Sequence, residues 1–435
     1  MNRLILSLSL LAAAAAPDAA AQISFAGYSH SVVTESPAAS TGLDAVYVLY
    51  DAAGVTVTYT SPSGNTSAVW QQYGSLGGGF AEPVEGLVRS GASTSLTLPA
   101  GDRGYIIEDG DKRYYFYIID YSQHPYEVTA IAPSAEQDCG QVSLDVTGQA
   151  AAINYYTING RSVELDRGIT LSYATMTLDD SSKTYRVDQA DVNFSHLSPV
   201  IHAPAPLCAT EFVLEGDRFL AQWGMGESVT STTMQPSAVE AYTSATQVSR
   251  DNSNETGAGN DGLGGSAPAE VEFYAAVTDA AVFTEWQFST YPDFDDIQLR
   301  ISDPVTTYTF REQGTTYVRF VCANDAGTCD YTGTVFTVSI GQSSLLCPNA
   351  FSPGASEGVN DEWKVSYSSI VEFECHIFNK LGVKMASLTD PSQGWDGRYN
   401  GKLVPAGVYY YVIKARGADD KKYNLSGDIN IVNYR

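Results

Sequence analysis

The residues that could carry out chemistry are few and scattered. The five histidines are scattered along the 435-residue chain, at His30, His124, His196, His202 and His376. The HExxH and GxxxxGK(S/T) patterns, which mark zinc proteases and phosphate-binding loops, are absent from the sequence. Adjacent carboxylates such as Asp179-Asp180 are typical of solvated surface acids, because the separation that a glycosidase needs between its two carboxylates is spatial. We therefore expect no catalytic residue, no cofactor and no metal site, in a protein that is not an enzyme.

Six cysteines offer a second kind of chemistry. They are Cys139, Cys208, Cys322, Cys329, Cys347 and Cys375. An even number is typical of disulfides in an oxidising compartment, and six cysteines allow 15 pairings. We predict structural disulfides that each close within one domain, namely 139–208, 322–329 and 347–375. Unbonded thiols are the alternative, and zinc is disfavoured because no CxxC pair occurs.

The N-terminus indicates export, and so an oxidising compartment. Arg3 precedes an apolar run from Leu4 to Ala16, and small residues at positions 19–21 offer a cleavage site, which together predict a signal peptide over residues 1–21. The run is shorter than the roughly 20 residues that span a bilayer, and no later segment has 18 apolar residues in succession. We expect no transmembrane segment once the signal peptide is removed.

The charge balance excludes two classes of partner. Lys and Arg number 24 against 50 Asp and Glu, which gives a net charge of −26 and a pI near 4.4. Nucleic acids and anionic lipids attract clusters of basic residues, so neither is an expected partner. A hydrophobic content of 44% is enough to bury cores, and the length suggests three or four domains.

Strand signals run along almost the whole chain. Runs of β-branched and aromatic residues with period-two alternation are separated by turn pairs such as Asp109-Gly110 and Asn159-Gly160. The pattern predicts an all-β protein of tandem immunoglobulin-like β-sandwiches, with Trp70 as a core anchor of the first one. The expected domains are a β-sandwich over 22–134, a second over 135–248, a Gly/Asn/Ser-rich linker over 249–268, a third sandwich over 269–341 and a C-terminal domain over 345–435.

Several segments allow more than one interpretation. The Tyr-rich strand 114–121 is an expected packing strand, with an exposed sugar-binding platform as the alternative. Residues 179–206 are polar and are expected to be rich in loops, and 212–214 and 219–223 are expected to be strands around a turn. The linker contains oxygen-bearing side chains that could hold calcium, although a solvated linker is favoured; they are Asp251, Asn254, Glu255 and Asp261.

The third sandwich resembles a PKD-type immunoglobulin-like domain. The matching residues are Trp286 with Phe288, Tyr308 to Phe310, Gly314 with Tyr317, Val318 and Phe320, and Asn324 to Gly327. The usual WDFGDG centre is represented only by Trp286 to Ser289 (WQFS). The resemblance implies a spacing or adhesive role.

Four short motifs follow one another near the C-terminus. They contain Pro348, Asn349, Phe351, Pro353, Asn360 and Asp361; then Phe378, Asn379 and Gly382; then Gly394, Trp395, Asp396, Gly397, Gly401 and Lys402; then Pro405, Gly407, Tyr409 and Tyr410. Together they resemble the gliding-motility-associated C-terminal domain, the type B sorting domain of the type IX secretion system of Bacteroidetes. Two departures occur: Lys380-Leu381 stands where Arg-Trp is common, and residues 354–358 replace the usual Gly-Asp-Gly, which weakens a calcium proposal there.

These patterns lead to one expected function and two alternatives. We expect an exported protein that passes through the periplasm to the cell surface or medium, is handled by the type IX machinery, and acts as a structural or adhesive module. It could instead be an accessory of the secretion or envelope machinery that binds envelope proteins. A third possibility is a face within residues 22–262 that binds extracellular glycans or hydrolyses them.

Overall fold

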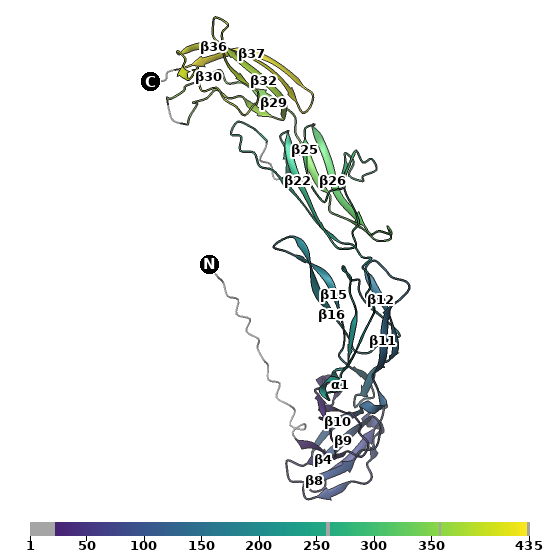
Figure 1. The fold of residues 1–435 in the computed structure, drawn as a ribbon. Coiled ribbons are helices and arrows are strands. Elements are labelled where there is room, and N and C mark those ends of the chain that lie inside the picture. Colours follow the sequence, from purple (N-terminus) through teal and green to yellow (C-terminus); the bar gives the residue numbers. More distant parts are fainter. Residues whose placement is uncertain (1–21, 258–261, 356–357, 433–435) are drawn as a thin grey trace. The chain divides into compact units, whose positions relative to one another are not determined.

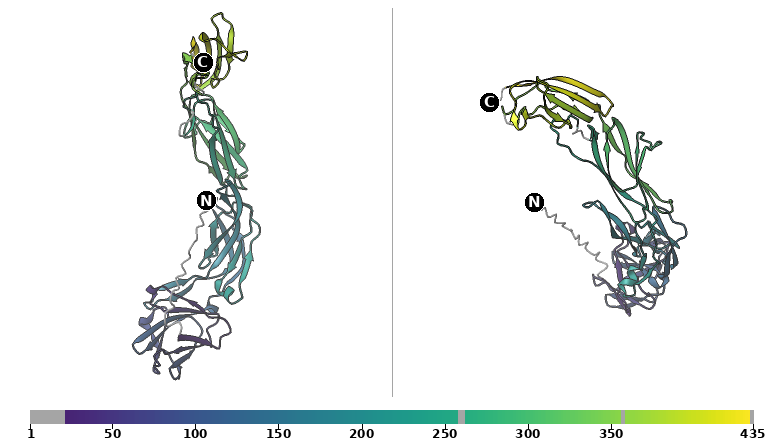
Figure 2. Two further views of the ribbon diagram at one scale, coloured as in Figure 1. Left: turned by 90° about the vertical axis from the view of Figure 1, so that its left-hand side faces the viewer. Right: turned by 45° about the horizontal axis from the view of Figure 1, so that its top comes forward.

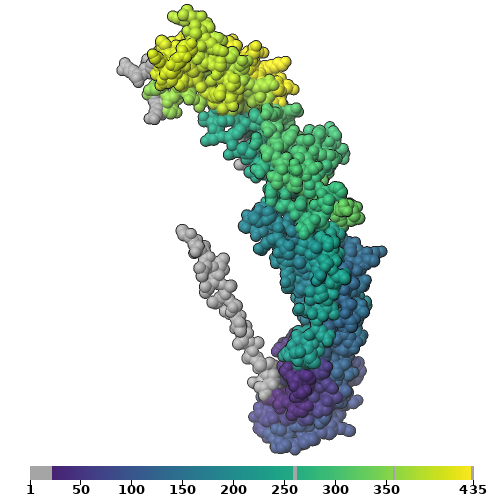
Figure 3. Space-filling model, in the orientation of Figure 1, coloured from purple at the N-terminus to yellow at the C-terminus, as the bar shows by residue number. Residues whose placement is uncertain are grey.

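The computed structural model describes residues 22–257, 262–355 and 358–432 (Figure 1). The chain divides into two compact units. The first extends to Thr175 and includes Asp188–Gln235, and the second comprises Met176–Val187 and the chain from Pro236 onward. Each unit consists of β-sheets with very little helix, as Figure 2 shows from two further sides, and Figure 3 shows the packed side chains. The predicted class, all-β with tandem immunoglobulin-like sandwiches, is confirmed.

The first sandwich has two sheets. The four-stranded sheet contains β1 (Ile23–Ala26), β4 (Thr56–Thr60), β8 (Ser93–Thr97) and β7 (Val88–Ser90). The six-stranded sheet contains β2 (Val33–Glu35), β3 (Ala45–Leu49), β10 (Lys112–Asp120), β9 (Arg103–Asp109), β5 (Val69–Tyr73) and β6 (Glu82–Pro83). Short 3-10 turns lie at η2 (Ala39–Thr41), η3 (Gly78–Phe80) and η4 (Tyr121–Gln123).

The predicted core anchor and hairpin of this sandwich are present. Trp70 is fully buried, and its indole nitrogen donates to Thr94 Oγ1 at 2.8 Å. Lys112 pairs with Asp109 across the predicted Asp-Gly turn. In the Tyr-rich strand, Tyr114 and Tyr117 are buried, which supports a packing role for that strand over an exposed platform.

The second sandwich begins earlier than the predicted residue 135. Its sheets contain β11 (Glu127–Pro133), β12 (Gln141–Gln149) and β17 (Val200–Pro204); β13 (Ile153–Tyr156) and β14 (Ser162–Leu165); and β16 (Thr184–Phe194), β15 (Ile169–Asp179), β18 (Val213–Gly216) and β19 (Glu227–Thr230). Strand β11, which we assigned to the first sandwich, pairs with β12. This pairing makes β11, which begins at Glu127, the first strand of the second sandwich.

Two local predictions in this sandwich are wrong. Residues 184–194 form strand β16 instead of loop, because a strand with two largely exposed faces carries no alternating hydrophobic signal. Residues 219–223 are not a strand; helix α1 (Arg218–Gln222) occupies this position. The carboxylate of Asp217 caps the helix by accepting hydrogen bonds from the amides of Phe219 and Leu220 at 3.1 and 3.0 Å.

The third sandwich begins with a strand that we assigned to the second. One sheet contains β20 (Ala241–Gln247), β22 (Ala269–Val277) and β25 (Val305–Phe310). The other contains β21 (Leu263–Gly265), β28 (Phe336–Ile340), β26 (Gly314–Ala323), β23 (Phe283–Ser289) and β24 (Leu299–Ile301), with β27 (Asp330–Thr332) also paired to β26. Trp286 and Phe320 are fully buried between the sheets, with ring centroids 5.0 Å apart.

The C-terminal sandwich has one five-stranded sheet and three smaller elements. The sheet contains β30 (Ala350–Phe351), β37 (Lys422–Ile431), β36 (Gly407–Gly417), β32 (Ile370–Phe378) and β33 (Lys384–Leu388). The small pairs are β29 (Ser344–Leu346) with β31 (Ser366–Ser368), and β34 (Arg398–Tyr399) with β35 (Lys402–Leu403). An isolated bridge joins Trp363 and Trp395.

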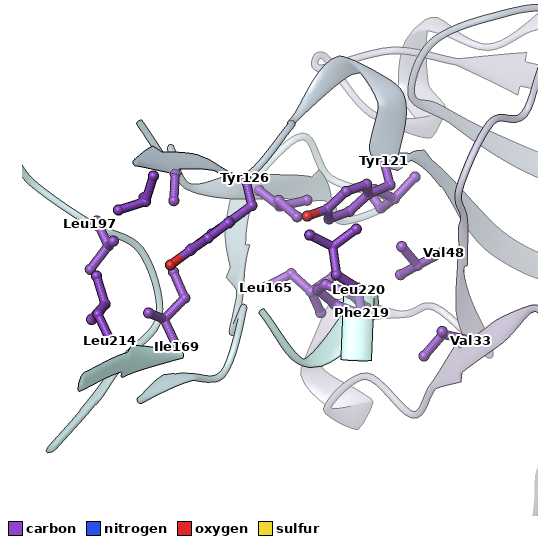
Figure 4. Close-up of a cluster of buried hydrophobic side chains, with 14 of the residues drawn as sticks. Val33, Val48, Tyr121, Tyr126, Leu165, Ile169, Leu197, Leu214, Phe219 and Leu220 are labelled. Carbon is purple, nitrogen blue, oxygen red and sulfur yellow. The ribbon is translucent and has the colours of Figure 1, made fainter. Parts of the chain in front are cut away.

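The first two sandwiches share one hydrophobic core. The cluster contains Val33 and Val48 of the first sandwich and Ile169 and Leu214 of the second. Figure 4 shows Phe219 and Leu220 of α1 beside Tyr121 in this cluster. Because the core is continuous, these two sandwiches form one unit, apart from residues 176–187 of β15 and β16.

Candidate functional sites

Three aromatic residues of the C-terminal motifs, Phe351, Trp395 and Tyr409, lie in the core of that sandwich. The ring centroid of Trp395 lies 5.6 Å from that of Phe351 and 5.2 Å from that of Tyr409. Trp395 also exchanges two backbone hydrogen bonds with Trp363, at 2.8 and 3.0 Å. The Tyr409 hydroxyl donates to the carbonyl of Pro405 at 2.9 Å. Motif residues that are distant in sequence therefore pack together in one aromatic cluster.

The polar and glycine positions of the motifs close turns. The Asn379 carboxamide oxygen accepts from the amides of Leu381 and Val383 at 2.9 and 3.0 Å, around Gly382 with φ +76°. The Asp396 carboxylate accepts from the Arg398 amide at 2.9 Å. Three motif glycines have a positive φ that other residues rarely adopt, namely Gly397, Gly401 and Gly407.

Close packing explains a fourth glycine. A Cβ on Gly394 would lie 2.6 Å from side-chain atoms of both Glu362 and Lys364. Two further motif residues lie on the outward face of the sheet, where Phe378 is half-buried and Tyr410, its register partner, is 46% exposed. Lys402 is exposed on β35.

The first motif forms a loop that its own carboxylate organises. Asp361 accepts from the amides of Gly354 and Gly358 at 2.8 and 2.6 Å, and the Asn360 carbonyl accepts from Ser352 at 2.9 Å. The remaining members have framework roles: the carbonyl of Pro348 accepts from the Trp363 indole, that of Asn349 accepts from Asn430, and Pro353 lies beside Gly397. The motif residues thus build a fold and assemble no reactive group.

The predicted linker is not a simple tether. Residues 250–257, here called the strap, run along the C-terminal sandwich within the second unit. Asn254 Nδ2 donates to the carbonyls of Val365 and Pro391 at 2.7 and 2.8 Å, and the Thr256 amide donates to the carbonyl of Tyr367 at 2.7 Å. These bonds join the segment to the sorting-motif domain.

A half-buried ion pair stabilises the strap. Glu255, whose side chain is fully buried, lies 2.7 Å from Arg250 Nη2 and accepts from Asn252 Nδ2 at 2.9 Å. Burial and this neighbouring carboxylate raise the pKa of the Tyr367 hydroxyl. Of the candidate calcium ligands, Asn254 and Glu255 are occupied by these contacts, Asp251 is exposed, and Asp261 lies outside the described residues.

The cysteines do not form the predicted pairs. Cys139 and Cys329 each take part in a disulfide, whereas Cys322, Cys347 and Cys375 are thiols. Strand register explains the failure of 322–329, because Cys322 pairs with Tyr331, two residues past Cys329. Such diagonal neighbours have Cβ atoms about 7 Å apart, beyond the roughly 4 Å that a disulfide needs.

The strand register is also offset by two residues for the predicted pair 139–208. The Gly140 carbonyl bonds to the Ala205 amide, so the residue opposite Cys139 precedes Cys208 by two positions. Cys347 and Cys375 are electrostatic neighbours: burial, with a smaller contribution from Cys347, raises the pKa of Cys375 to about 12. Cys347 forms a side-chain hydrogen bond with Tyr411.

A buried charged network at the joint of the first unit was not predicted. Arg167 and Asp217 are completely buried and lie 2.6 Å apart. Arg167 also donates to the Tyr121 hydroxyl at 3.0 Å and to the carbonyls of Ala151 and His124, both at 2.9 Å. The network links both sandwiches to α1. In the sequence, the Gly-Asp pair before the helix indicates only a turn.

One described cluster brings together serine, histidine and a carboxylate. Glu164 accepts from Ser195 Oγ at 2.6 Å and lies 2.6 Å from His196 Nδ1. Glu164 and His196 are exposed and Ser195 is half-buried. Ser195 Oγ and Glu164 lie against the same ring nitrogen, His196 Nδ1, at 3.4 and 2.6 Å, so the order needed for a histidine base between serine and acid is not present. Within the described ranges, no three His, Cys, Asp or Glu residues are grouped to hold a metal ion.

None of the described helices has the length and hydrophobicity that crossing a bilayer requires. The predicted signal peptide lies outside the described residues. The described residues form a series of immunoglobulin-like sandwiches, and the last sandwich carries the C-terminal motifs.

Comparisons with known proteins identify two of the sandwiches. Residues 345–431 match the CHU_C Type IX secretion signal domain, and residues 131–231 match the fibronectin type III domain. The resemblance of the C-terminal motifs to type IX sorting domains is thus confirmed. A type IX sorting signal implies handling by that secretion machinery and export to the cell surface or extracellular space.

Similarity to solved structures is weak beyond the fold class. A tetra-tandem repeat from the extending region of a large adhesion protein aligns over 88% of this chain and 96% of its own, with 12% identity and a TM-score of 0.21. Dimeric latent PorU from Porphyromonas gingivalis aligns over 74% of this chain and 35% of its own, with 11% identity and a TM-score of 0.15. No curated protein matches the chain.

Proposed function

We propose that the protein is a type IX cargo that crosses the periplasm, reaches the cell surface or medium, and serves there as a structural or adhesive module without catalysis. The match of residues 345–431 to a type IX secretion signal domain carries this proposal. The motif residues support it, because their contacts make a self-contained sandwich with its own aromatic core.

The remaining sandwiches fit the role of cargo. Trp70, Trp286 and Phe320 lie in their cores, and the fully buried network at Arg167 joins two sandwiches into one unit. Fastened sandwiches suit a structural or adhesive part, because such a part must hold its form outside the cell. A PKD-like role for residues 269–341 stays a prediction.

The experiment compares cells that have and lack a working type IX translocon. With it, antibody labelling of intact cells should detect the protein at the surface or in the medium; without it, the protein should accumulate in the periplasm. Attachment of cells with and without the protein to abiotic and cellular surfaces tests the adhesive role. Equal surface labelling in both strains would show that another route exports the protein.

A further inference from the structure

A polar pocket in the first sandwich is not used by the sorting function. It lies between the end of β5, the segment 74–81 containing η3, β6 and the start of β9, and its volume is about 610 Å³. This volume is within the range of about 300–1,000 Å³ that is typical of small-molecule sites. We call it the loop pocket; its lining includes Gln72, Leu76, Phe80, Glu82, Asp102 and Arg103.

The loop that forms one wall is braced in place. Gly78 donates its amide hydrogen to the Ile158 carbonyl at 2.7 Å. Gly77 has φ +80°, and a Cβ there would lie 2.3 Å from the Gly160 nitrogen, so only glycine allows this approach to the β13–β14 hairpin. A Cβ on Gly160 would in turn lie 2.7 Å from the Leu76 carbonyl oxygen. Because the loop is already ordered, a ligand would bind at a low cost in conformational entropy.

This braced loop exposes two large apolar side chains. Leu76 is 64% exposed and Phe80 is 67% exposed, although both lie in a segment held by backbone contacts. An aromatic ring presented at the edge of a polar pocket offers a flat face to the C–H surface of a ligand. Their position therefore points to a ligand with an apolar face.

The opposite wall carries planar polar groups that are also held in place. Arg103 Nη1 donates to Gln72 Oε1 at 3.1 Å, and the buried Arg103 Nε has no hydrogen-bond partner among the described residues. Asp102 accepts from the Asp120 amide at 2.9 Å and lies 2.7 Å from His124 Nε2. The wall thus offers both donors and acceptors in fixed positions.

The charges select against ionic ligands. Two carboxylates, Glu82 and Asp102, line the pocket of a chain whose net charge is −26, which disfavours an anion. The guanidinium of Arg103 offsets one of these carboxylates, which weakens the attraction of a cation. A neutral polyol satisfies both, because each hydroxyl can donate to a carboxylate and accept from a guanidinium.

We propose that the loop pocket binds one or two sugar units of a neutral glycan, with the ring stacked on Phe80 and its hydroxyls bonded to the polar wall. The proposal deepens the adhesive part of the proposed function, since it names the class of ligand that a surface module would hold. Binding is measured on purified protein, so its failure is separate from a failure of type IX export.

The test is affinity electrophoresis of the purified full chain in gels containing laminarin, mannan or galactan, with heparin and polygalacturonate as anionic probes. At least one neutral polysaccharide should retard the chain, and the variant F80A should weaken that affinity by about tenfold. Phe80 is mostly exposed, so its loss should leave the fold intact. E82A, which removes an exposed acceptor, should also weaken binding.

The matched control is F283A, which removes an exposed aromatic side chain from β23, far from the pocket in sequence. It should bind as the unaltered chain does. Three results would overturn the proposal: no retardation by any neutral polysaccharide, retardation only by the anionic ones, or equal weakening by F80A and F283A.

Discussion

The buried pair of Arg167 and Asp217 gives the sharpest stability prediction. In the variant R167M the aliphatic stem is largely kept, but the Asp217 carboxylate loses its cation, and two carbonyls lose their donors. Removing one partner of a buried ion pair costs about 3–5 kcal/mol, because the other charge stays desolvated. For a unit of this size that corresponds to a fall in Tm of about 6–20 °C.

The control is an exposed pair in the same unit. Arg113 lies 2.8 Å from Glu108, with side chains 61% and 31% exposed, so R113M should change the Tm very little, since water screens an exposed pair. The double variant R167M/D217N removes both charges while asparagine can still cap α1, so it should recover part of the loss.

Thermal unfolding followed by near-ultraviolet circular dichroism measures these differences. Hydrogen exchange of peptides from the first unit assigns the transition to it. A loss of Tm for R167M no greater than that for R113M would refute the reasoning, and so would a double variant that is less stable than R167M.

Two further predictions concern one carboxylate and the strap. Burial alone would raise the pKa of Asp109, but hydrogen bonds from Ser61, Asn65 and Tyr59 outweigh it, and the folded-state pKa lies below the ordinary 3.8. The ionised carboxylate stabilises the fold above its unfolded-state pKa, and this stabilisation is lost as the pH falls through the folded-state pKa. Acid titration should therefore show a smaller loss of unfolding free energy below about pH 4 in D109N than in the unaltered chain. Identical titration curves for the two would contradict this. N254A leaves two carbonyls without their donor at a cost of about 1–3 kcal/mol. Hydrogen exchange of residues 250–257 should therefore be faster in N254A, and it should be unchanged in N193A, a control substitution at an exposed site. Unchanged exchange in N254A would argue against a docked strap.

Local sequence signals predicted the features that depend on neighbouring residues. The Asp-Gly hairpin between β9 and β10 depends on two adjacent turn residues, and Trp70 lies in an alternating strand. The C-terminal motifs could be identified because each closes a turn or fills the core at a fixed spacing. Their aromatic residues meet as expected for one sandwich.

Features that depend on long-range pairing were missed. Predicting disulfide partners requires the strand register, and in this register the residue opposite Cys322 is Tyr331, two residues past Cys329. The strap has the composition of a linker, yet Asn254 finds its acceptors more than 100 residues away. Arg167 gave no signal either, because a single arginine in a sequence does not reveal the buried carboxylate that it meets.

The central claim is that residues 345–435 direct the protein out of the cell. The most direct measurement is the fraction of the protein that intact cells expose to antibody, compared between the full chain and a chain that ends at residue 344, with periplasmic extracts measured in parallel. The account predicts that the full chain is exposed and that the shortened chain remains in the periplasm in folded form. Equal exposure of the two chains on intact cells would contradict it.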